Sequence, residues 1–381
     1  MQSTLLISLY ILGSLALLAT AVFGTLLWAR NLAQERNRIF YKVRNPKGID
    51  VLAPVEIGGH KQWLHIRGRN RDNPVLLFLH GGPGMSHIGF YDETQRPWEE
   101  YFTVVQWDQR HTGKSYDIPL KKIEKTITHE QKLDDAEEVI AYLRSHLNKE
   151  KIFIMGYSYG TYLGMKMAKR RPEWLYGYIG VGQVVNNMEG FREEHALLLA
   201  DAKRKNNKVL VAKLNAMMPV PDPNNKMRHL KHEYYMGQEL VRAGKSEITI
   251  EDALAITKFG FLTSAHYTLS NLLHIPPMRF ISEGSKFGED FMDIDLPTEV
   301  GSSFDVPIVF MTGANDWHIP CTLTDAWFKE IDAPFKEQVW FEDTSHFHVI
   351  SEPGKFLFSL VTKVLPLAQE KRDEKNRFKK K

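Results

Sequence analysis

The first apolar stretch of the chain is much longer than the others. No charged side chain occurs between Met1 and Ala29, and the apolar run from about Leu5 to Trp28 would form a helix roughly 36 Å long. A hydrocarbon core is about 30 Å thick, so this run can cross a membrane with some tilt. A core helix rarely lacks charge for so long, and no basic side chain precedes the run as in a signal peptide. We therefore expect residues 1–29 to be a retained transmembrane anchor.

A basic segment follows the apolar run. Residues 30–50 are expected to form a linker, in which Glu35 is opposed by these bases: Arg30, Arg36, Arg38, Lys42, Arg44 and Lys47. The positive-inside rule places such a flank, and the body of the chain after it, in the cytoplasm. The sequence also lacks an Asn-x-Ser/Thr sequon, which agrees with a body outside the secretory lumen. We expect a single-pass membrane protein.

Short apolar runs that alternate with amphipathic stretches fill the rest of the chain. Residues 55–67 alternate around a Gly-Gly pair, which favours a β-hairpin. Buried-strand runs follow at residues 75–79, 102–107, 152–155, 307–311 and 338–341. One helix is expected from Thr128, where Thr128 and Gln131 can form a capping box, and another after Ser158. This alternation predicts a mostly parallel sheet flanked by helices.

One region interrupts the alternation. From residue 185 to 304 the pattern is helical, and no run has the character of a core strand. We expect these residues to form a helical cap inserted after the sixth strand. The α/β core would then comprise residues 51–184 and 305–369, followed by a charged tail at 370–381.

Composition narrows the possible functions. The chain has 381 residues, a formal net charge of +3 and 25% charged residues, and it shows no interleaved basic and aromatic motif, so nucleic acid is not an expected partner. The single cysteine, Cys321, excludes an internal disulfide. No pattern around Cys321 resembles the signature of a cysteine enzyme.

The strongest chemical signal is a serine between a predicted strand and a predicted helix. The run at 152–155 leads into Gly156-Tyr157-Ser158-Tyr159-Gly160, a GxSxG sequence. The motif alone is weak, but it needs a strand before it and a helix after it, because the serine occupies a tight turn. The context disfavours a merely structural glycine-rich turn. We therefore expect Ser158 to be a nucleophile.

Two later loops can supply the partners of this serine. In this fold the acid and the histidine follow the nucleophile in that order. Asp316 follows the run at 307–311, and His346 follows the run at 338–341, so both lie where strands of a parallel sheet end. His318 and His348 are the competing bases. The pair His346 and His348 could also suggest a metal, but no further ligand accompanies them, so no metal site is expected.

A glycine-rich loop can stabilise the oxyanion. His80-Gly81-Gly82-Pro83-Gly84 follows the run at 75–79, and its glycines let backbone N–H groups approach a developing negative charge. We expect the N–H groups of Gly82 and Tyr159 to form the oxyanion hole. His80 itself is expected to orient the loop through hydrogen bonds.

These motifs resemble those of proline iminopeptidases and related α/β-hydrolase aminopeptidases. HGGPG at 80–84 is joined by Asp108-Gln109-Arg110-His111-Thr112-Gly113-Lys114-Ser115, and the nucleophile, acid and histidine loops follow in the family's order, over roughly residues 55–365. The family usually has glycine where His111 stands, and Tyr157 and Tyr159 replace a glycine and a tryptophan beside the nucleophile. The resemblance therefore implies an α/β-hydrolase fold and acyl-enzyme chemistry more strongly than prolyl specificity.

The resemblance also implies that cap carboxylates bind the free amino terminus of a substrate. Glu189, Glu193 and Glu194 begin the cap, although a solvated helix face would give the same pattern. An aminopeptidase, a membrane-tethered esterase or lipid hydrolase, and a non-catalytic binding protein remain open, and the complete triad argues against the last. The substrate would be a small peptide or ester, and no cofactor is expected.

Overall fold

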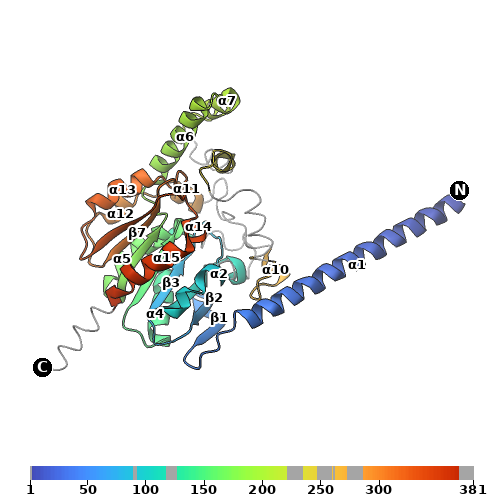
Figure 1. Cartoon of the computed structure of the whole chain (residues 1–381), viewed down its shortest axis with the longest axis horizontal. Helices are drawn as coiled ribbons and strands as arrows, with labels where there is room; N and C mark the ends of the chain where they lie inside the picture. The colour runs from blue at the N-terminus through green and yellow to red at the C-terminus, as the bar shows by residue number, and fades with distance from the viewer. Residues whose placement is uncertain are drawn as a thin grey trace.

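A single long helix and a mixed α/β body make up the chain. The structure, a computed structural model, describes residues 2–88, 92–116, 127–220, 235–246, 260, 262–272 and 286–368, so the tail expected at 370–381 lies outside the described residues. Helix α1 (Gln2–Phe40) leaves the body as an extended rod (Figure 1). From Leu6 to Phe40 it is long and apolar enough to cross a membrane, and its most apolar window makes no buried contact with the body. Residues 30–40 of the expected linker are therefore helical.

The body is built on one eight-stranded sheet in the order β1-β2-β4-β3-β5-β6-β7-β8. β1 (Ile49–Ile57) and β2 (His60–Gly68) form the expected hairpin, and β2 also pairs antiparallel with β4. The other neighbouring strands are parallel. They are β3 (Val75–Leu79), β4 (Thr103–Asp108), β5 (Ile152–Tyr157), β6 (Leu175–Val181), β7 (Ile308–Gly313) and β8 (Lys336–Phe341). The mostly parallel sheet predicted from the sequence is confirmed.

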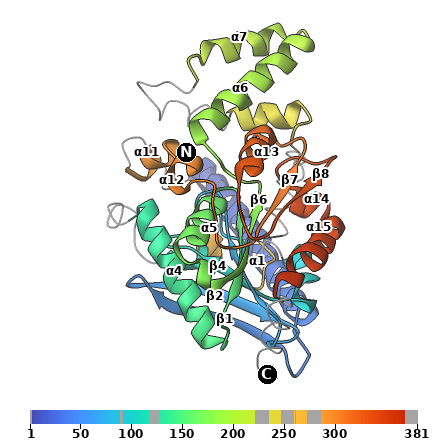
Figure 2. The ribbon, with the colours of Figure 1, turned by 90° about the vertical axis from the view of Figure 1, so that its left-hand side faces the viewer.

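Helices pack on both faces of this sheet (Figure 2). Side chains of β3 alternate between two apolar clusters: Leu77 faces the cluster that includes α4 and α5, and Phe78 faces the cluster that includes α15. The helices of the core are α2 (Asp92–Gln95), α4 (His129–His146), α5 (Tyr159–Arg170), α13 (Cys321–Glu330), α14 (His348–Ser351) and α15 (Pro353–Ser359). Shorter 3₁₀ turns lie at η1 (Trp98–Glu100), η2 (Gly113–Ser115) and η4 (Pro172–Trp174), and η6 (Leu360–Val364) is a π-helix.

The start of α4 differs in one detail from the predicted capping box. The side chain of Thr128 accepts a hydrogen bond from the backbone N–H of Gln131 at 3.1 Å, as an N-cap should. The side chain of Gln131 does not complete the box. It donates to Oδ1 of Asp135 at 3.0 Å, because that buried carboxylate offers a stronger acceptor one turn further along the helix.

The cap lies between β6 and β7, as the sequence predicted. Its described helices are α6 (Asn187–Arg204), α7 (Lys208–Ala216), α10 (Leu269–Leu272), α11 (Lys286–Met292) and α12 (Leu296–Val300), and the described part of the cap contains no strand of the sheet. α6 and α7 rise above the sheet and share a small apolar cluster that includes Leu198 and Leu214 (Figure 2).

The two ends of the cap meet where it joins the core. Asn186 and Asp295 form an antiparallel bridge, and the N–H of Leu296 donates to the carbonyl of Val185 at 2.8 Å. The N–H of Asn187 donates to the carbonyl of Ile294 at 3.0 Å. We call these paired segments, residues 185–187 and 294–296, the neck of the cap.

The glycines around Ser158 generate a first testable prediction. A Cβ at Gly160 would overlap the carbonyl oxygen of Leu79 and come within 3.0 Å of that of His80, so there is no flexible side chain to yield. We expect Gly160→Ala to lower the free energy of unfolding by about 2–3 kcal/mol, as overpacking does. Urea denaturation in detergent measures it. Gly354→Ala in α15, where a Cβ meets nothing within 4 Å, is the control and should be neutral or slightly stabilising. An equal effect of both substitutions would contradict the packing analysis.

Candidate active site

Ser158 occupies the sharp turn that joins β5 to α5. Its backbone has φ 53° and ψ −124°, a region that residues with a side chain rarely adopt. The N–H of Ser158 donates to the carbonyl of Val181 in β6 at 2.9 Å, which ties the turn to the neighbouring strand. A Cβ at Gly156 would come too close to the carbonyl of Gly160, so both outer residues of the motif must be glycine. The turn presents Ser158 at the carboxyl edge of the sheet.

Asp316 and His346 meet at the same edge. Asp316 follows β7 and His346 follows β8, and Oδ2 of Asp316 lies 2.8 Å from Nδ1 of His346. Burial alone would raise the pKa of Asp316, but the charge and hydrogen bond of His346, with the N–H of Ile319 donating at 2.8 Å, hold that pKa below its usual value. The carboxylate therefore stays ionised and fixes the orientation of the imidazole.

The backbone after β6 connects this pair to Ser158. Gly182 has φ +58°, and a Cβ there would lie 2.7 Å from Cε1 of His346. Gly182 immediately follows Val181, the residue whose carbonyl holds Ser158. The Tyr157 ring lies 5.1 Å from the His346 ring, and the Tyr157 hydroxyl donates to the His346 carbonyl at 3.1 Å. The three residues that the sequence proposed as a triad therefore come from three separate loops of one edge.

The glycine-rich loop packs directly over the nucleophile turn. A Cβ at Gly81 would lie 2.8 Å from the Cβ of Ser158, and Gly82 has φ +115°. Tyr159 is the first residue of α5, so its N–H has no acceptor within the helix and lies at the positive end of the helix dipole. Gly81 thus lies against Ser158 and Tyr159 follows it in the chain, and the N–H groups of Gly82 and Tyr159 remain the expected oxyanion hole.

His80 is bonded into the loop at both ring nitrogens. Nδ1 lies 3.0 Å from the carbonyl oxygen of Gly81, and Nε2 accepts from the N–H of Gln109 at 3.3 Å. This arrangement requires a neutral ring, and burial lowers the pKa of His80 to about 3. The orienting contacts expected from the sequence are present.

The two competing histidines occupy different environments. His348 is fully buried, packs 4.7 Å from the ring of Phe341, and has its pKa lowered to about 4 by burial. The ring of His318 is one-third exposed and lies 5.3 Å from the ring of His346. His318 therefore lies next to the candidate site. The sequence suggested it only as a competing base, because its local pattern does not indicate which residues it contacts.

The three cap glutamates differ sharply in burial. Glu189 is half exposed and pairs with Arg192, and Glu193 accepts a hydrogen bond from the Thr322 hydroxyl. Glu194 is 0% exposed, and neither of its carboxylate oxygens has a hydrogen-bond partner among the described residues. Nδ1 of His318, a ring that is charged only when protonated, lies 3.7 Å from this carboxylate. Burial raises the pKa of Glu194, and His318 opposes that rise.

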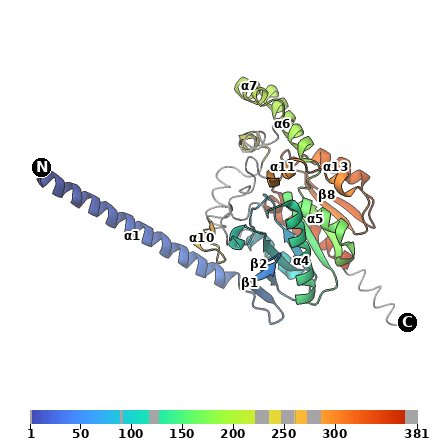
Figure 3. The same cartoon turned by 180° about the vertical axis from the view of Figure 1, so that it is seen from behind.

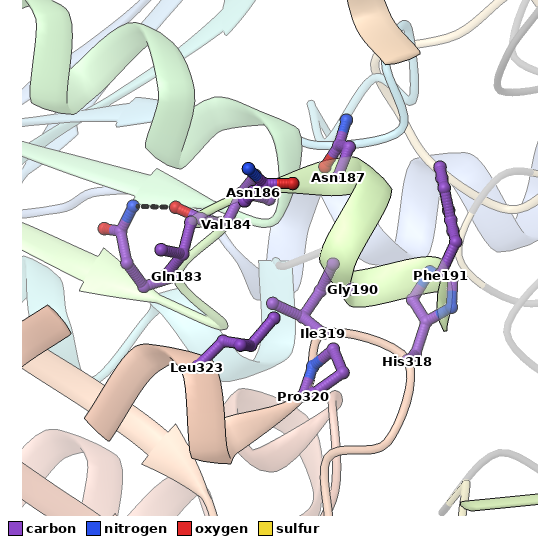
Figure 4. Close-up of a pocket in the computed structure, with 11 residues that line it drawn as sticks. Gln183, Val184, Asn186, Asn187, Gly190, Phe191, His318, Ile319, Pro320 and Leu323 are labelled. Atoms are coloured by element: carbon purple, nitrogen blue, oxygen red, sulfur yellow. Dashed lines mark hydrogen bonds between the residues drawn. The ribbon is translucent and has the colours of Figure 1, made fainter. Parts of the chain in front are cut away.

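A small hollow opens beside these residues at the junction of cap and core (Figure 4). It is lined from the cap by Asn187, Gly190 and Phe191 and from the core by His318 and Leu323. Figure 4 shows Phe191 of α6 and His318 on the same side of the hollow, away from Gln183. Glu194 lies one turn beyond Gly190 on the same helix, so the hollow borders the candidate site.

Two residues of the DQR motif, Asp108 and Arg110, make buried hydrogen bonds and an ion pair in the α/β core. Arg110 forms a bidentate pair with Asp135, with Nε–Oδ2 at 2.7 Å and Nη2–Oδ1 at 2.6 Å. Asp108 accepts from the N–H of Lys114 at 2.7 Å and from the hydroxyl of Ser86, and burial raises its pKa to about 7. In the sequence, this motif indicates only the family resemblance. Its structural role depends on contacts between residues that are far apart in the chain, which no local pattern reveals.

Comparison with known proteins agrees with this architecture. Residues 74–353 match the family described as the alpha/beta hydrolase fold. The chain is 32% identical over 321 residues to the probable aminopeptidase YbaC of Bacillus subtilis, covering 82% of this chain and 96% of that protein. It is 27% identical over 198 residues to a proline iminopeptidase of Elizabethkingia meningoseptica, covering 51% of this chain and 61% of that protein.

Solved structures share the fold at low sequence identity. The proline iminopeptidase of Mycobacterium smegmatis superposes with a TM-score of 0.52 at 19% identity, covering 83% of this chain and 97% of that one. A membrane phospholipase A superposes with a TM-score of 0.55 at 15% identity, covering 94% and 98%. At such identities the likeness concerns the fold alone.

The lone thiol gives a prediction that is independent of the serine. Cys321 is partly buried, its Sγ lies 3.4 Å from the Ala314 carbonyl, and burial, together with the charge of Asp316, raises its pKa to about 11. Because the thiolate is the reactive form, we expect iodoacetamide to alkylate the folded chain slowly at pH 8 and faster as the pH rises toward 11. The urea-unfolded chain is the control. Equal rates for both at pH 8 would contradict the raised pKa.

Proposed function

The chain belongs to the α/β-hydrolase fold family, and from this premise we propose that it is a serine hydrolase that acts through an acyl-enzyme. Ser158 is the proposed nucleophile, His346 the general base and Asp316 the residue that orients the base. The observation that carries the proposal is the Asp316–His346 hydrogen bond at the edge where the strained Ser158 turn lies.

The proposed reaction moves one proton in each half. Oγ of Ser158 attacks the substrate carbonyl carbon while Nε2 of His346 takes the hydroxyl proton. The imidazolium then gives that proton to the leaving amine or alcohol, and the acyl-enzyme forms as the carbonyl is restored. Water, deprotonated by His346, attacks the acyl-enzyme, and the imidazolium returns its proton to the departing Oγ of Ser158 as the acid is released. The lowered pKa of Asp316 keeps a negative charge beside the imidazolium throughout.

The oxyanion of each tetrahedral intermediate would bind the N–H groups of Gly82 and Tyr159. Backbone donors need no reorganisation as charge develops, and the removal of one such donor commonly costs about 10²–10³ in turnover. The helix dipole of α5 adds to this field. Fixed donors beside Ser158 are what acyl transfer requires.

The nucleophile is tested directly by substitution. We expect Ser158→Ala to lower turnover by on the order of a million-fold, because members of a triad act as a unit. A fluorophosphonate probe should label the parent and the Cys321→Ser variant, but not Ser158→Ala. Equal labelling of parent and Ser158→Ala would refute the assignment.

For the substrate, we propose a small peptide with a free amino terminus. Glu194 supports this proposal because its carboxylate is fully buried, accepts no hydrogen bond among the described residues and lies 3.7 Å from the ring of His318, which is charged only when protonated. A substrate ammonium would supply a permanent positive charge there. The His318 ring neighbours both Glu194 and His346, so Glu194 lies near the proposed triad. Glu189 and Glu193 already have partners and are weaker candidates for the same role.

An esterase is the second candidate, and α1 is the feature that favours it. We propose that residues 6–28 anchor the chain in a membrane and that the basic residues after them keep the body in the cytoplasm. An anchored hydrolase has ready access to lipid esters. Such substrates carry no α-ammonium group and would leave Glu194 unused.

Acetylation of the substrate distinguishes the two candidates. An ammonium–carboxylate contact contributes roughly 1.5–3 kcal/mol. We expect Glu194→Gln to lower kcat/KM for a free amino-acid arylamide by about ten- to a hundred-fold, since 1.4 kcal/mol is about tenfold. Because the pKa of Glu194 is raised, kcat/KM of the parent should increase as the pH rises through it, and Glu194→Gln should lose that dependence.

The matched control is Glu189→Gln, an exposed position five residues earlier on the same helix, which should change little. The N-acetylated arylamide should be a poor substrate of the parent and equally poor for Glu194→Gln. If the parent cleaves the acetylated and free forms equally well, and short-chain esters faster than either, the aminopeptidase proposal is wrong and the esterase replaces it.

A further inference from the structure

The first turns of α1 beyond its charge-free part bind one segment of the cap. Nη2 of Arg30 donates to the carbonyl of Tyr267 at 2.7 Å, and Nε2 of Gln34 donates to the same carbonyl at 3.0 Å. Nδ2 of Asn37 donates to the carbonyl of Thr263 at 3.0 Å. Residues spaced by four and then three share one face of a helix, so Arg30, Gln34 and Asn37 form one face of α1 that binds this cap segment.

These contacts fix the position of the cap segment along the axis of α1, measured from the end of the apolar part of that helix. The charge-free part ends at Ala29, and a helix rises about 1.5 Å per residue, so Arg30 and Asn37 lie roughly 2 and 12 Å beyond it. The polar layer on each side of a hydrocarbon core is about 5–8 Å thick. A span that ends near Ala29 therefore places Tyr267 in the headgroup layer and Thr263 roughly 4–7 Å outside it.

The same segment is also bonded to the α/β core. Tyr267 is 2% exposed, and its hydroxyl contacts Ser86 and lies 3.4 Å from Oδ1 of Asp108. Nζ of Lys114 donates to the carbonyl of His266 at 3.0 Å. Because α1 holds the segment from one side and the core from the other, the segment fixes how the core is oriented relative to the membrane helix.

Apolar side chains project from the segment at both ends of these contacts. Leu262 is 39% exposed and Leu269 is 43% exposed. Leu269 begins α10, which lies beside the last third of α1 (Figure 3). Arg36 of the adjoining turns of α1 adds positive charge near this level, and Arg38 is paired with Glu35. An exposed leucine beside a basic residue near headgroup depth, as Leu269 is, is typical of an interfacial membrane contact.

We propose that residues 264–272 are a membrane-contact surface of the cap, seated in the lipid headgroup layer beside α1. The partner is a bilayer that contains anionic lipid, and the proposal rests on the membrane anchoring proposed above. It makes this segment of the cap face the leaflet rather than the bulk solvent.

The test uses the full chain reconstituted in vesicles of phosphatidylcholine and phosphatidylserine. In a Cys321→Ser background, an environment-sensitive fluorophore is attached at Leu269→Cys or at Phe358→Cys. Phe358 is 66% exposed in α15 and is the matched control on the core (Figure 1). We expect a headgroup nitroxide lipid to quench the fluorophore at 269 several-fold more than at 358. Arg30→Ala/Gln34→Ala/Asn37→Ala should remove most of that difference while the chain stays in the membrane.

Two outcomes would overturn the proposal, and they are distinguishable. If the chain resists alkaline carbonate extraction but positions 269 and 358 are quenched equally, the contact surface is wrong and the anchor stands. If carbonate releases the full chain, the anchor and the contact surface both fail, while the fluorophosphonate and arylamide assays still decide the hydrolase proposal.

Discussion

The positive φ of Ser158 is the constraint around which the carboxyl edge of the sheet is built. A side chain in that conformation costs on the order of 1–3 kcal/mol and persists only where its surroundings enforce it. Here Val181 accepts from its N–H, Gly81 lies against its Cβ, and Gly160 lets α5 begin against the end of β3. Backbone from the ends of β3, β5 and β6 therefore packs around this one turn, because each supplies part of what holds it.

Much of this arrangement could be predicted, because buried strands and the order of their loops leave local patterns. β3 has the predicted bounds, and β4, β5, β7 and β8 lie within about two residues of theirs. β6 has no counterpart among the predicted runs, because Gly177 and Gly180 lower its apparent strand propensity. Both glycines lie in tight packing, against Pro307 and Gln183 respectively, which no local pattern reveals.

The parts that could not be predicted depend on contacts between distant residues. The three cap glutamates look alike in sequence, and only the packed structure separates buried Glu194 from its exposed neighbour Glu189. His111 gives a further example. Its φ of +59° explains why the resembling family usually has glycine there, since a side chain in the left-handed region is unfavourable by about 1–2 kcal/mol. The sequence shows that His111 differs from the family pattern, but it does not show the backbone conformation that explains the difference.

The neck of the cap has a consequence for how this architecture can diversify. Its hydrogen bonds close the whole inserted segment into a loop whose two ends are neighbours, on a core that continues from β6 to β7 as though nothing intervened. The entropic cost of closing a loop grows only slowly, by about 0.6 kcal/mol for each doubling of its length. Insertions between Asn186 and Asp295 therefore cost little in loop closure, as long as the cap residues that pack into the core, such as Phe287 and Met292, are kept. The length of the cap can change in this way without a change in the path of the sheet beneath it.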